Sequence, residues 1–180
     1  MQRMSGIATQ TSAIVELIEG TDAKLLDTRK TTPCLRYIEK WAVRIGGGHN
    51  HRFGLYDMIM LKDNHIDYSG GIENAIKRAN HYLESSGKKM KIEIEVRNEK
   101  ELAEVLRVGK VDRIMLDNFT PERIREALKM IPEIYEVEAS GGITIETIRD
   151  FAETGVDFIS VGALTHSFKS LDMSLKATFN

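Results

Sequence analysis

Short apolar runs alternate with amphipathic segments along most of the 180-residue chain. The runs at 25–26 and 58–61 end abruptly in charged residues, which is typical of buried parallel strands whose last residues emerge into a site. We predict strands at 23–28, 57–62, 90–96, 112–117, 134–139 and 157–162. Helices are predicted at 35–45, 72–86, 99–108, 121–131, 144–154 and 168–178, after a first amphipathic helix that ends near 20–21.

This alternation predicts a single α/β domain with a parallel sheet and right-handed crossovers. The strands could form an open doubly wound sheet or close into a barrel. Neither GxGxxG nor GxxxxGK[ST] follows a strand, so the two commonest nucleotide-binding open sheets are excluded. Polar or glycine residues follow nearly every strand, and in a barrel these ends converge on one mouth. The pattern therefore favours a (β/α) barrel of the TIM type, with helices around parallel strands.

Composition adds few restrictions. The chain is 42% hydrophobic and 29% charged, and its formal net charge of −2 gives no indication of nucleic acid or an acidic membrane as a partner. No apolar run approaches the roughly 20 residues that span a bilayer, and the first residues lack the pattern of a signal peptide. The single cysteine, Cys34, excludes an internal disulfide. We therefore expect a cytoplasmic protein.

Cationic residues concentrate between 27 and 66, at the ends of two predicted strands. Of the seven Lys and Arg residues in this stretch, those grouped with the strand ends are Arg29, Lys30, Arg52 and Lys62, with His51 beside them. Guanidinium groups bind carboxylates and phosphates in a bidentate manner, and lysine supplies a mobile point charge. A solvated charged loop is the alternative, but it does not explain why the charges follow apolar runs twice. We predict a site for an anionic ligand.

Two other kinds of strand end accompany the cations. Glu95 and Asp117 follow apolar strands and suit a sugar hydroxyl or Mg²⁺, although a structural salt bridge would explain them equally well. Glu93 points to the same face as Glu95, so the pattern alone does not choose between them. Glycine-rich segments at 140–142 and 162–166 follow the last two strands, where barrels often bind phosphate.

The order of these motifs resembles one family closely, the carboxylating nicotinate-nucleotide pyrophosphorylases, or quinolinate phosphoribosyltransferases. The resemblance covers essentially all 180 residues. The matching segments are SGIAT at 5–9, DTRKTTP at 27–33, GGGHNHR at 46–52, GLYD at 54–57, KDNHI at 62–66, EIEV at 93–96, LDNF at 116–119, EASGGI at 138–143 and VGALTH at 161–166.

This resemblance implies an open-sided barrel that transfers a phosphoribosyl group from phosphoribosyl pyrophosphate to quinolinate. The products would be nicotinate mononucleotide, pyrophosphate and CO₂, with Mg²⁺ as cofactor. Lys30, Lys62, Glu95 and Asp117 would be catalytic, and Glu95 and Asp117 would hold Mg²⁺, directly or indirectly. The substrate-binding set would be Thr28, Arg29, Lys30, His51, Arg52, Lys62, Glu95, Asp117, Ser140, Gly141, Gly142, Gly162, Ala163, Leu164 and His166.

The chain departs from the family pattern in two places. Cys34 stands where the family usually has glycine. If the position requires a positive φ, a cysteine there costs about 1 kcal/mol or more of stability. The family's N-terminal α/β sandwich, which completes the partner subunit's site in its dimers and larger assemblies, is expected to be absent from residues 1–180. Two alternatives stay open: a related phosphoribosyltransferase for another aromatic acid, including relatives linked to molybdenum transport, or an inactive barrel that only binds ligand.

Overall fold

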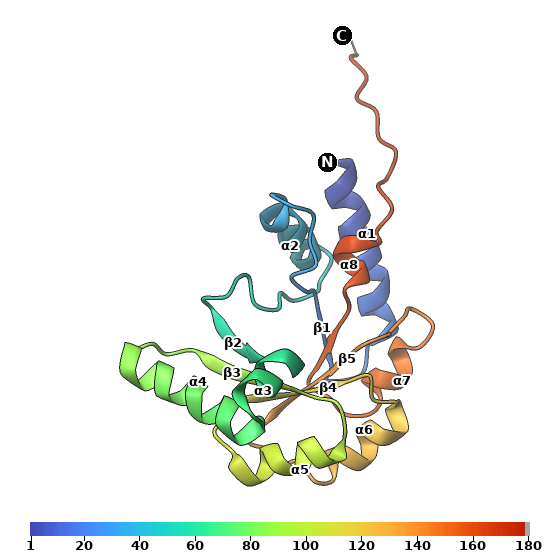
Figure 1. Cartoon of the computed structure of the whole chain (residues 1–180). Coiled ribbons are helices and arrows are strands. Elements are labelled where there is room, and N and C mark those ends of the chain that lie inside the picture. Colours follow the sequence, from blue (N-terminus) through green and yellow to red (C-terminus); the bar gives the residue numbers. More distant parts are fainter. Residues whose placement is uncertain (179–180) are drawn as a thin grey trace.

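The structure is a computed structural model that describes residues 1–178, and in it six strands alternate with helices (Figure 1). Each predicted strand is present within two residues of its expected start and end. The elements are α1 (Gln2–Leu17), β1 (Lys24–Leu26), α2 (Arg36–Ile45), β2 (Met58–Leu61), α3 (Asp63–Ser69), α4 (Ile72–Ser86), β3 (Lys91–Val96), α5 (Glu99–Val108), β4 (Arg113–Asp117), α6 (Pro121–Leu128), β5 (Glu136–Ser140), α7 (Ile148–Ala152), β6 (Phe158–Ser160) and α8 (Ala163–His166).

The strands form one parallel sheet in the order β1-β6-β5-β4-β3-β2. Since β1 and β2 are the two edges, no hydrogen-bonded pairing between them closes the barrel among the described residues. A single bridge between Leu26 and His49 extends the β1 edge toward the gap. The prediction of an open barrel of parallel strands, surrounded by helices, is confirmed.

Helices cover the outer face of the curved sheet, with α4, α5 and α6 in sequence below the strands in the view of Figure 1. Ile94, Ile114 and Ile159 are fully buried in this layer, as expected for parallel strands covered by helices. Thr120 caps α6 by accepting a hydrogen bond from Arg123 N–H, and Pro121 occupies the first turn. These local signals explain why the α6 start was predictable.

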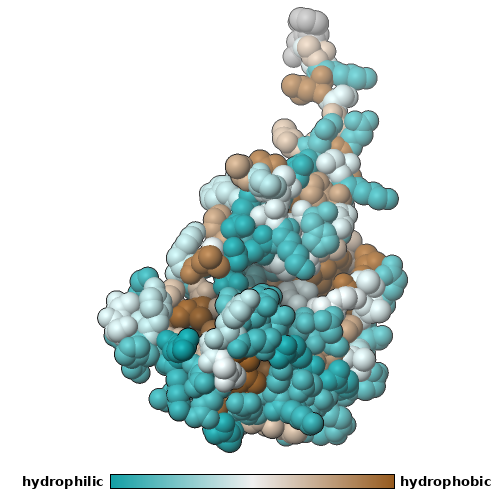
Figure 2. Space-filling model, viewed as in Figure 1, coloured by the Kyte–Doolittle hydropathy of each residue, from teal (hydrophilic) through white to brown (hydrophobic). Residues whose placement is uncertain are grey.

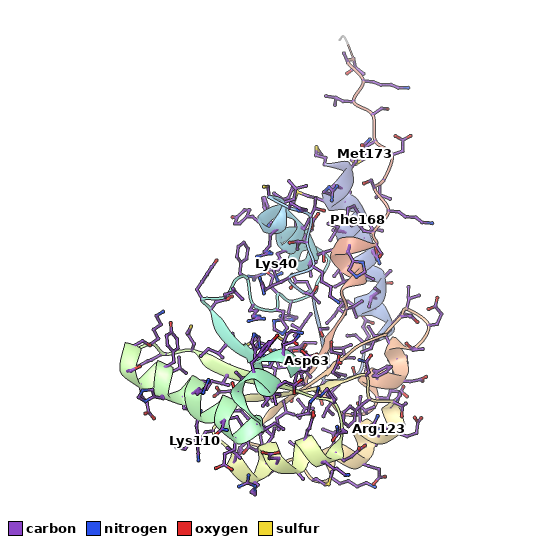
Figure 3. All side chains as sticks on the ribbon, in the orientation of Figure 1. Lys40, Asp63, Lys110, Arg123, Phe168 and Met173 are labelled. Atoms are coloured by element: carbon purple, nitrogen blue, oxygen red, sulfur yellow. The ribbon has the colours of Figure 1, made fainter. Side chains whose placement is uncertain are left out.

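The predicted helix at 168–178 is wrong: the chain there has no regular structure and runs from α8 past the start of α1. Figure 3 shows Phe168 and Met173 along this segment. Leu175 is fully exposed, so an amphipathic helix would have no surface against which to bury its apolar side, and isolated helices of this length are marginal in water. Two short helices, α3 and α8, were not predicted, and α7 is shorter than the predicted 144–154.

Cys34 has a φ of 64° and is exposed, so the position does require a left-handed backbone. The hydrogen bonds by which Arg36 holds this turn are nevertheless formed. The Arg36 guanidinium donates hydrogen bonds to Thr31 Oγ1 and to the Phe53 carbonyl oxygen, each at 3.1 Å. The cysteine therefore introduces local strain without displacing Arg36.

The visible surface is mostly hydrophilic, with small separate apolar patches (Figure 2). Within residues 1–178, none of the helices combines the length and apolar character needed to cross a bilayer.

Candidate active site

A cavity of about 770 Å³ opens at the carboxyl ends of the strands. Every predicted site residue except Leu164 lines it; Leu164 is fully buried in the core. The sequence analysis missed further lining residues on the same strand ends: Met60, Met115, Asn118, Ile143, Thr144, Ser160 and Val161. Asn118 directly follows Asp117, and its position after an apolar run was a signal that could have identified it.

The cationic side of the cavity comes from β1, β2 and the segment between them. Arg29 keeps a buried Nε without a hydrogen-bond partner. Burial and the nearby charge of Arg29 lower the pKa of Arg52, whose Nη1 lies 3.5 Å from the Met58 carbonyl oxygen. Two guanidinium groups that repel each other and are incompletely paired form a site suited to a dianionic ligand.

Glu95 and Asp117 lie on the neighbouring strands β3 and β4 and form the acidic side of the cavity. Glu95 Oε2 accepts a hydrogen bond from Lys62 Nζ at 2.8 Å. Burial and the charge of Glu95 raise the pKa of Asp117, while the amide of Asn118, 2.6 Å from Asp117 Oδ2, opposes this rise. Two mutually repelling carboxylates at the cavity wall fit a Mg²⁺ ion that keeps several water ligands.

The third side consists of the glycine segments after β5 and β6. Gly141 has a φ of 93°, and a Cβ there would lie 2.3 Å from Asn118 Oδ1. The Thr165 hydroxyl donates to the Lys30 carbonyl oxygen at 2.9 Å, and Ser160 Oγ donates to Ser140 Oγ at 3.0 Å. Bare backbone next to a lysine provides the room and the charge that a phosphate group requires.

Gly141 and Gly142 allow a matched test of this segment. Both have positive φ, but no atom lies within 4 Å of a Cβ built on Gly142. Gly141→Ala should therefore lower the thermal midpoint more than Gly142→Ala and weaken ligand binding, because Asn118 and its hydrogen bond to Asp117 must move. Thermal unfolding and calorimetric titration of both variants measure the difference. Equal effects would show that the left-handed backbone, and not the contact with Asn118, is what excludes a side chain.

Beneath the cavity, three buried ionisable side chains meet in the barrel interior. His51 Nε2 lies 3.0 Å from Glu93 Oε2 and 3.5 Å from Glu138 Oε2. Burial disfavours the charged form of the ring, whereas the neighbouring carboxylates of Glu138 and Glu93 favour it. Burial and the charge of Glu138 raise the pKa of Glu93. Glu138 was not among the predicted site residues, although its alternation with Val137 and Ala139 in β5 indicated that it points into the barrel.

A second buried group anchors the segment that carries His51. Asp27 accepts hydrogen bonds from Lys40 Nζ, from Asn50 Nδ2 at 2.6 Å and from His51 N–H at 2.8 Å. Lys40 projects from α2 (Figure 3) and also donates to the His51 carbonyl oxygen at 3.0 Å. Burial raises the pKa of Asp27 and lowers the pKa of Lys40 in spite of their mutual attraction. The helix thus places the loop at the mouth of the barrel.

Six parallel strands with cationic, acidic and glycine-rich ends around one cavity define an α/β-barrel protein with a site for an anionic ligand. The chain belongs to the family described as quinolinate phosphoribosyl transferase, C-terminal domain, which matches residues 7–176.

Relatives of known identity agree with this assignment. A probable carboxylating nicotinate-nucleotide pyrophosphorylase of Bacillus subtilis is 49% identical over the whole chain and 61% of its own length. The chloroplastic enzyme of Arabidopsis thaliana is 47% identical over 98% of the chain and 54% of its own length. The chain therefore spans little more than half the length of these relatives.

Solved structures show the same likeness. NadC from Streptococcus pyogenes superposes with a TM-score of 0.91 at 46% identity, covering 98% of the chain and 61% of NadC. The nicotinate-nucleotide pyrophosphorylase from Francisella tularensis superposes with a TM-score of 0.90 at 45% identity, covering 97% of the chain and 60% of that protein. The expected family is confirmed, and the fold is shared over nearly the whole chain.

Proposed function

We propose that this chain carries the catalytic barrel of a carboxylating nicotinate-nucleotide pyrophosphorylase in NAD biosynthesis. The observation that carries the proposal is the meeting of three kinds of strand end in one cavity, in a member of this family. The substrates would be quinolinate and phosphoribosyl pyrophosphate, and the products nicotinate mononucleotide, pyrophosphate and CO₂.

Each side of the cavity suits one part of this reaction. Arg29, Arg52 and Lys62 offer positive charge to the two carboxylates of quinolinate. Lys30 and the glycine segments at 140–142 and 162–163 suit the 5-phosphate, with Thr28 and His166 at the same wall. Lys62 belongs to the cationic side of the cavity, and its ammonium group contacts Glu95 on the acidic side. It is therefore placed to touch both substrates.

In the transfer, the ring nitrogen of quinolinate forms a bond to the anomeric carbon as the bond from that carbon to pyrophosphate breaks. Positive charge develops on the sugar, next to Glu95 and Asp117, and negative charge on pyrophosphate, next to the lysines. Mg²⁺ held at Glu95 and Asp117 would neutralise the pyrophosphate charge. Loss of CO₂ then leaves an electron pair on the ring carbon, which the cationic wall stabilises until a proton is taken up.

Two further properties belong to this proposal. Association as a homodimer or larger assembly is supported by the exposed aromatic side of α2, where Tyr37 is 70% exposed and Trp41 55% exposed. Light scattering of the purified chain tests this, and a monomer at all concentrations would contradict it. A cytoplasmic location is supported by the free, exposed thiol of Cys34.

Product formation by the purified 180-residue chain tests the central proposal. With Mg²⁺ and phosphoribosyl pyrophosphate, quinolinate should yield nicotinate mononucleotide, whereas nicotinate should not, and chelation by EDTA should stop the reaction. Binding of both substrates without turnover would favour a barrel that needs further chain to complete its site. Turnover with nicotinate in place of quinolinate would contradict the assignment of the dicarboxylate.

A further inference from the structure

His51 lines the cavity, but its Nε2 is buried, and within the described residues this atom makes no hydrogen bond. Its Nε2 faces the carboxylates of Glu93 and Glu138, and its Nδ1 accepts a hydrogen bond from the Arg52 backbone N–H at 2.7 Å. Its own backbone N–H and carbonyl oxygen are bound by Asp27 and Lys40. The ring therefore has no nitrogen left to point at a ligand in the cavity, while its neighbour Arg52 lines the cavity with a guanidinium group.

The groups that hold the ring are buried to an extent that stability alone does not explain. Glu93 and Glu138 have no exposed surface, and Arg113, whose Nη1 lies 3.1 Å from Glu138 Oε2, is 8% exposed. Burying such charges costs several kcal/mol, and apolar residues of the same volume are often as stable or more so. The barrel interior nevertheless keeps these charges directly beneath the cationic wall.

Arg52 connects the buried His51 cluster to the cavity, because its backbone contacts the His51 ring and its side chain lines the cavity. Arg29 and Arg52 repel each other, and the one side-chain hydrogen bond of Arg52 within the described residues is the 3.5 Å contact with Met58. The short bond from its backbone N–H to the His51 ring sets where its side chain begins. We propose, on the basis of the function proposed above, that His51 is a positioning residue which Glu93 and Glu138 hold from below, and which fixes Arg52 toward the dicarboxylate.

A metal ion is the competing explanation for the cluster, because donor atoms of His51, Glu93 and Glu138 lie within 4.8 Å of one another. The Arg113 guanidinium already pairs with Glu138, and burial together with the charge of Glu138 raises the pKa of Glu93. With one carboxylate paired and the other inclined to keep its proton, the cluster does not require a cation from outside. Elemental analysis of the purified chain decides the point. One equivalent of a divalent transition metal that is lost in Glu138→Gln would overturn the proposal.

The variant Glu138→Gln keeps the size of the side chain and removes its charge. In the whole chain labelled with ¹⁵N, the resonances of the His51 ring should shift, because Nε2 loses a carboxylate partner. Calorimetric titration should show about tenfold weaker binding of quinolinate, in line with the energies that couple neighbouring residues. Binding of phosphoribosyl pyrophosphate, which the opposite walls hold, should change less than threefold. Glu93→Gln is the second variant should Glu138→Gln fail to fold.

The double variant His51→Ala/Glu138→Gln separates positioning from direct binding. If both residues act through Arg52, the double variant should bind quinolinate no more weakly than His51→Ala alone. Additive losses would overturn the proposal, as would a shifted His51 spectrum with unchanged quinolinate binding. Val137→Ala is the control, because Val137 is buried next to Glu138 but faces the helices; it should lower stability without changing either affinity. If the unaltered chain does not bind quinolinate, the proposed function itself fails, whatever the His51 spectrum shows.

Discussion

Replacing Lys62 with alanine is expected to reduce kcat/KM by about 100-fold or more, the usual cost of removing one fixed charge that stabilises a transition state. Lys62 Nζ is 2.8 Å from Glu95 Oε2, and its side chain is 45% exposed at the cavity, so it is accessible to substrates. Without it, Glu95 and Asp117 would face each other with less compensating charge, and the dicarboxylate would lose a cation. Steady-state kinetics and calorimetric titration of both substrates measure the two losses.

Lys77→Ala is a suitable control for Lys62→Ala. Lys77 lies on α4, is exposed and pairs with Glu73 at 2.7 Å, away from the lining of the cavity. Exposed ion pairs of this kind contribute about 0–1 kcal/mol, so this variant should keep its activity. A Lys62→Ala variant with unchanged affinity and turnover would place the chemistry elsewhere. Lys62→Arg tests charge against shape, because a guanidinium keeps the charge but not the compact head group.

Replacing Asp27 with alanine is expected to destabilise the chain by about 3–5 kcal/mol, because it leaves the Lys40 ammonium buried without a counter-charge. Lys40 is 1% exposed and Asp27 is not exposed at all. For a chain of this size the loss corresponds to a thermal midpoint lower by roughly 10 °C. His51 N–H would also lose its acceptor, so ligand binding should weaken in the molecules that remain folded. Denaturant and thermal unfolding monitored by circular dichroism measure the change.

The double variant Asp27→Ala/Lys40→Met should recover part of this stability, because it removes both buried charges together. Asp22→Ala is the control: Asp22 is exposed and precedes the same strand, so its removal should change the unfolding free energy by less than about 0.5 kcal/mol. An Asp27→Ala variant as stable as the parent would mean that Lys40 reaches solvent or loses its proton without cost.

The strand pattern was predictable because the strands are parallel and covered by helices. Such strands form near-continuous apolar runs, and the polar residue that ends each run marks the edge where the sites of barrels form. This is why Arg29, Lys62, Glu95 and Asp117 could be predicted from the sequence to share one site. The same pattern could not show whether Glu93 or Glu95 faces the ligand. Both point inward, and only depth in the barrel separates fully buried Glu93 from Glu95 in the cavity wall.

Helix α2 shows a limit of the hydrophobic pattern. Its bounds follow from the sequence, but its orientation does not: Glu39 and Lys40 are buried, whereas Tyr37 and Trp41 are exposed. From the sequence alone, Trp41 would be expected to pack on the inner face of the helix, and the structure shows that it does not. Glu39 is bound by the Arg3 guanidinium at 2.7 Å and Lys40 by Asp27, partners that lie 36 and 13 residues away in the chain. Such distant partners leave no local signal.

The sequence by itself determined the order of strands and helices, the three kinds of strand end and the family. These depend on the periodicity of side chains along each element and on motifs of a few neighbouring residues. Only the tertiary structure decided that the opening of the barrel lies between β1 and β2, that residues 168–178 form no helix, and that His51 lies against buried carboxylates from two strands. The reason is physical: burial, and the pairing of charges that burial requires, depend on which distant segments pack together.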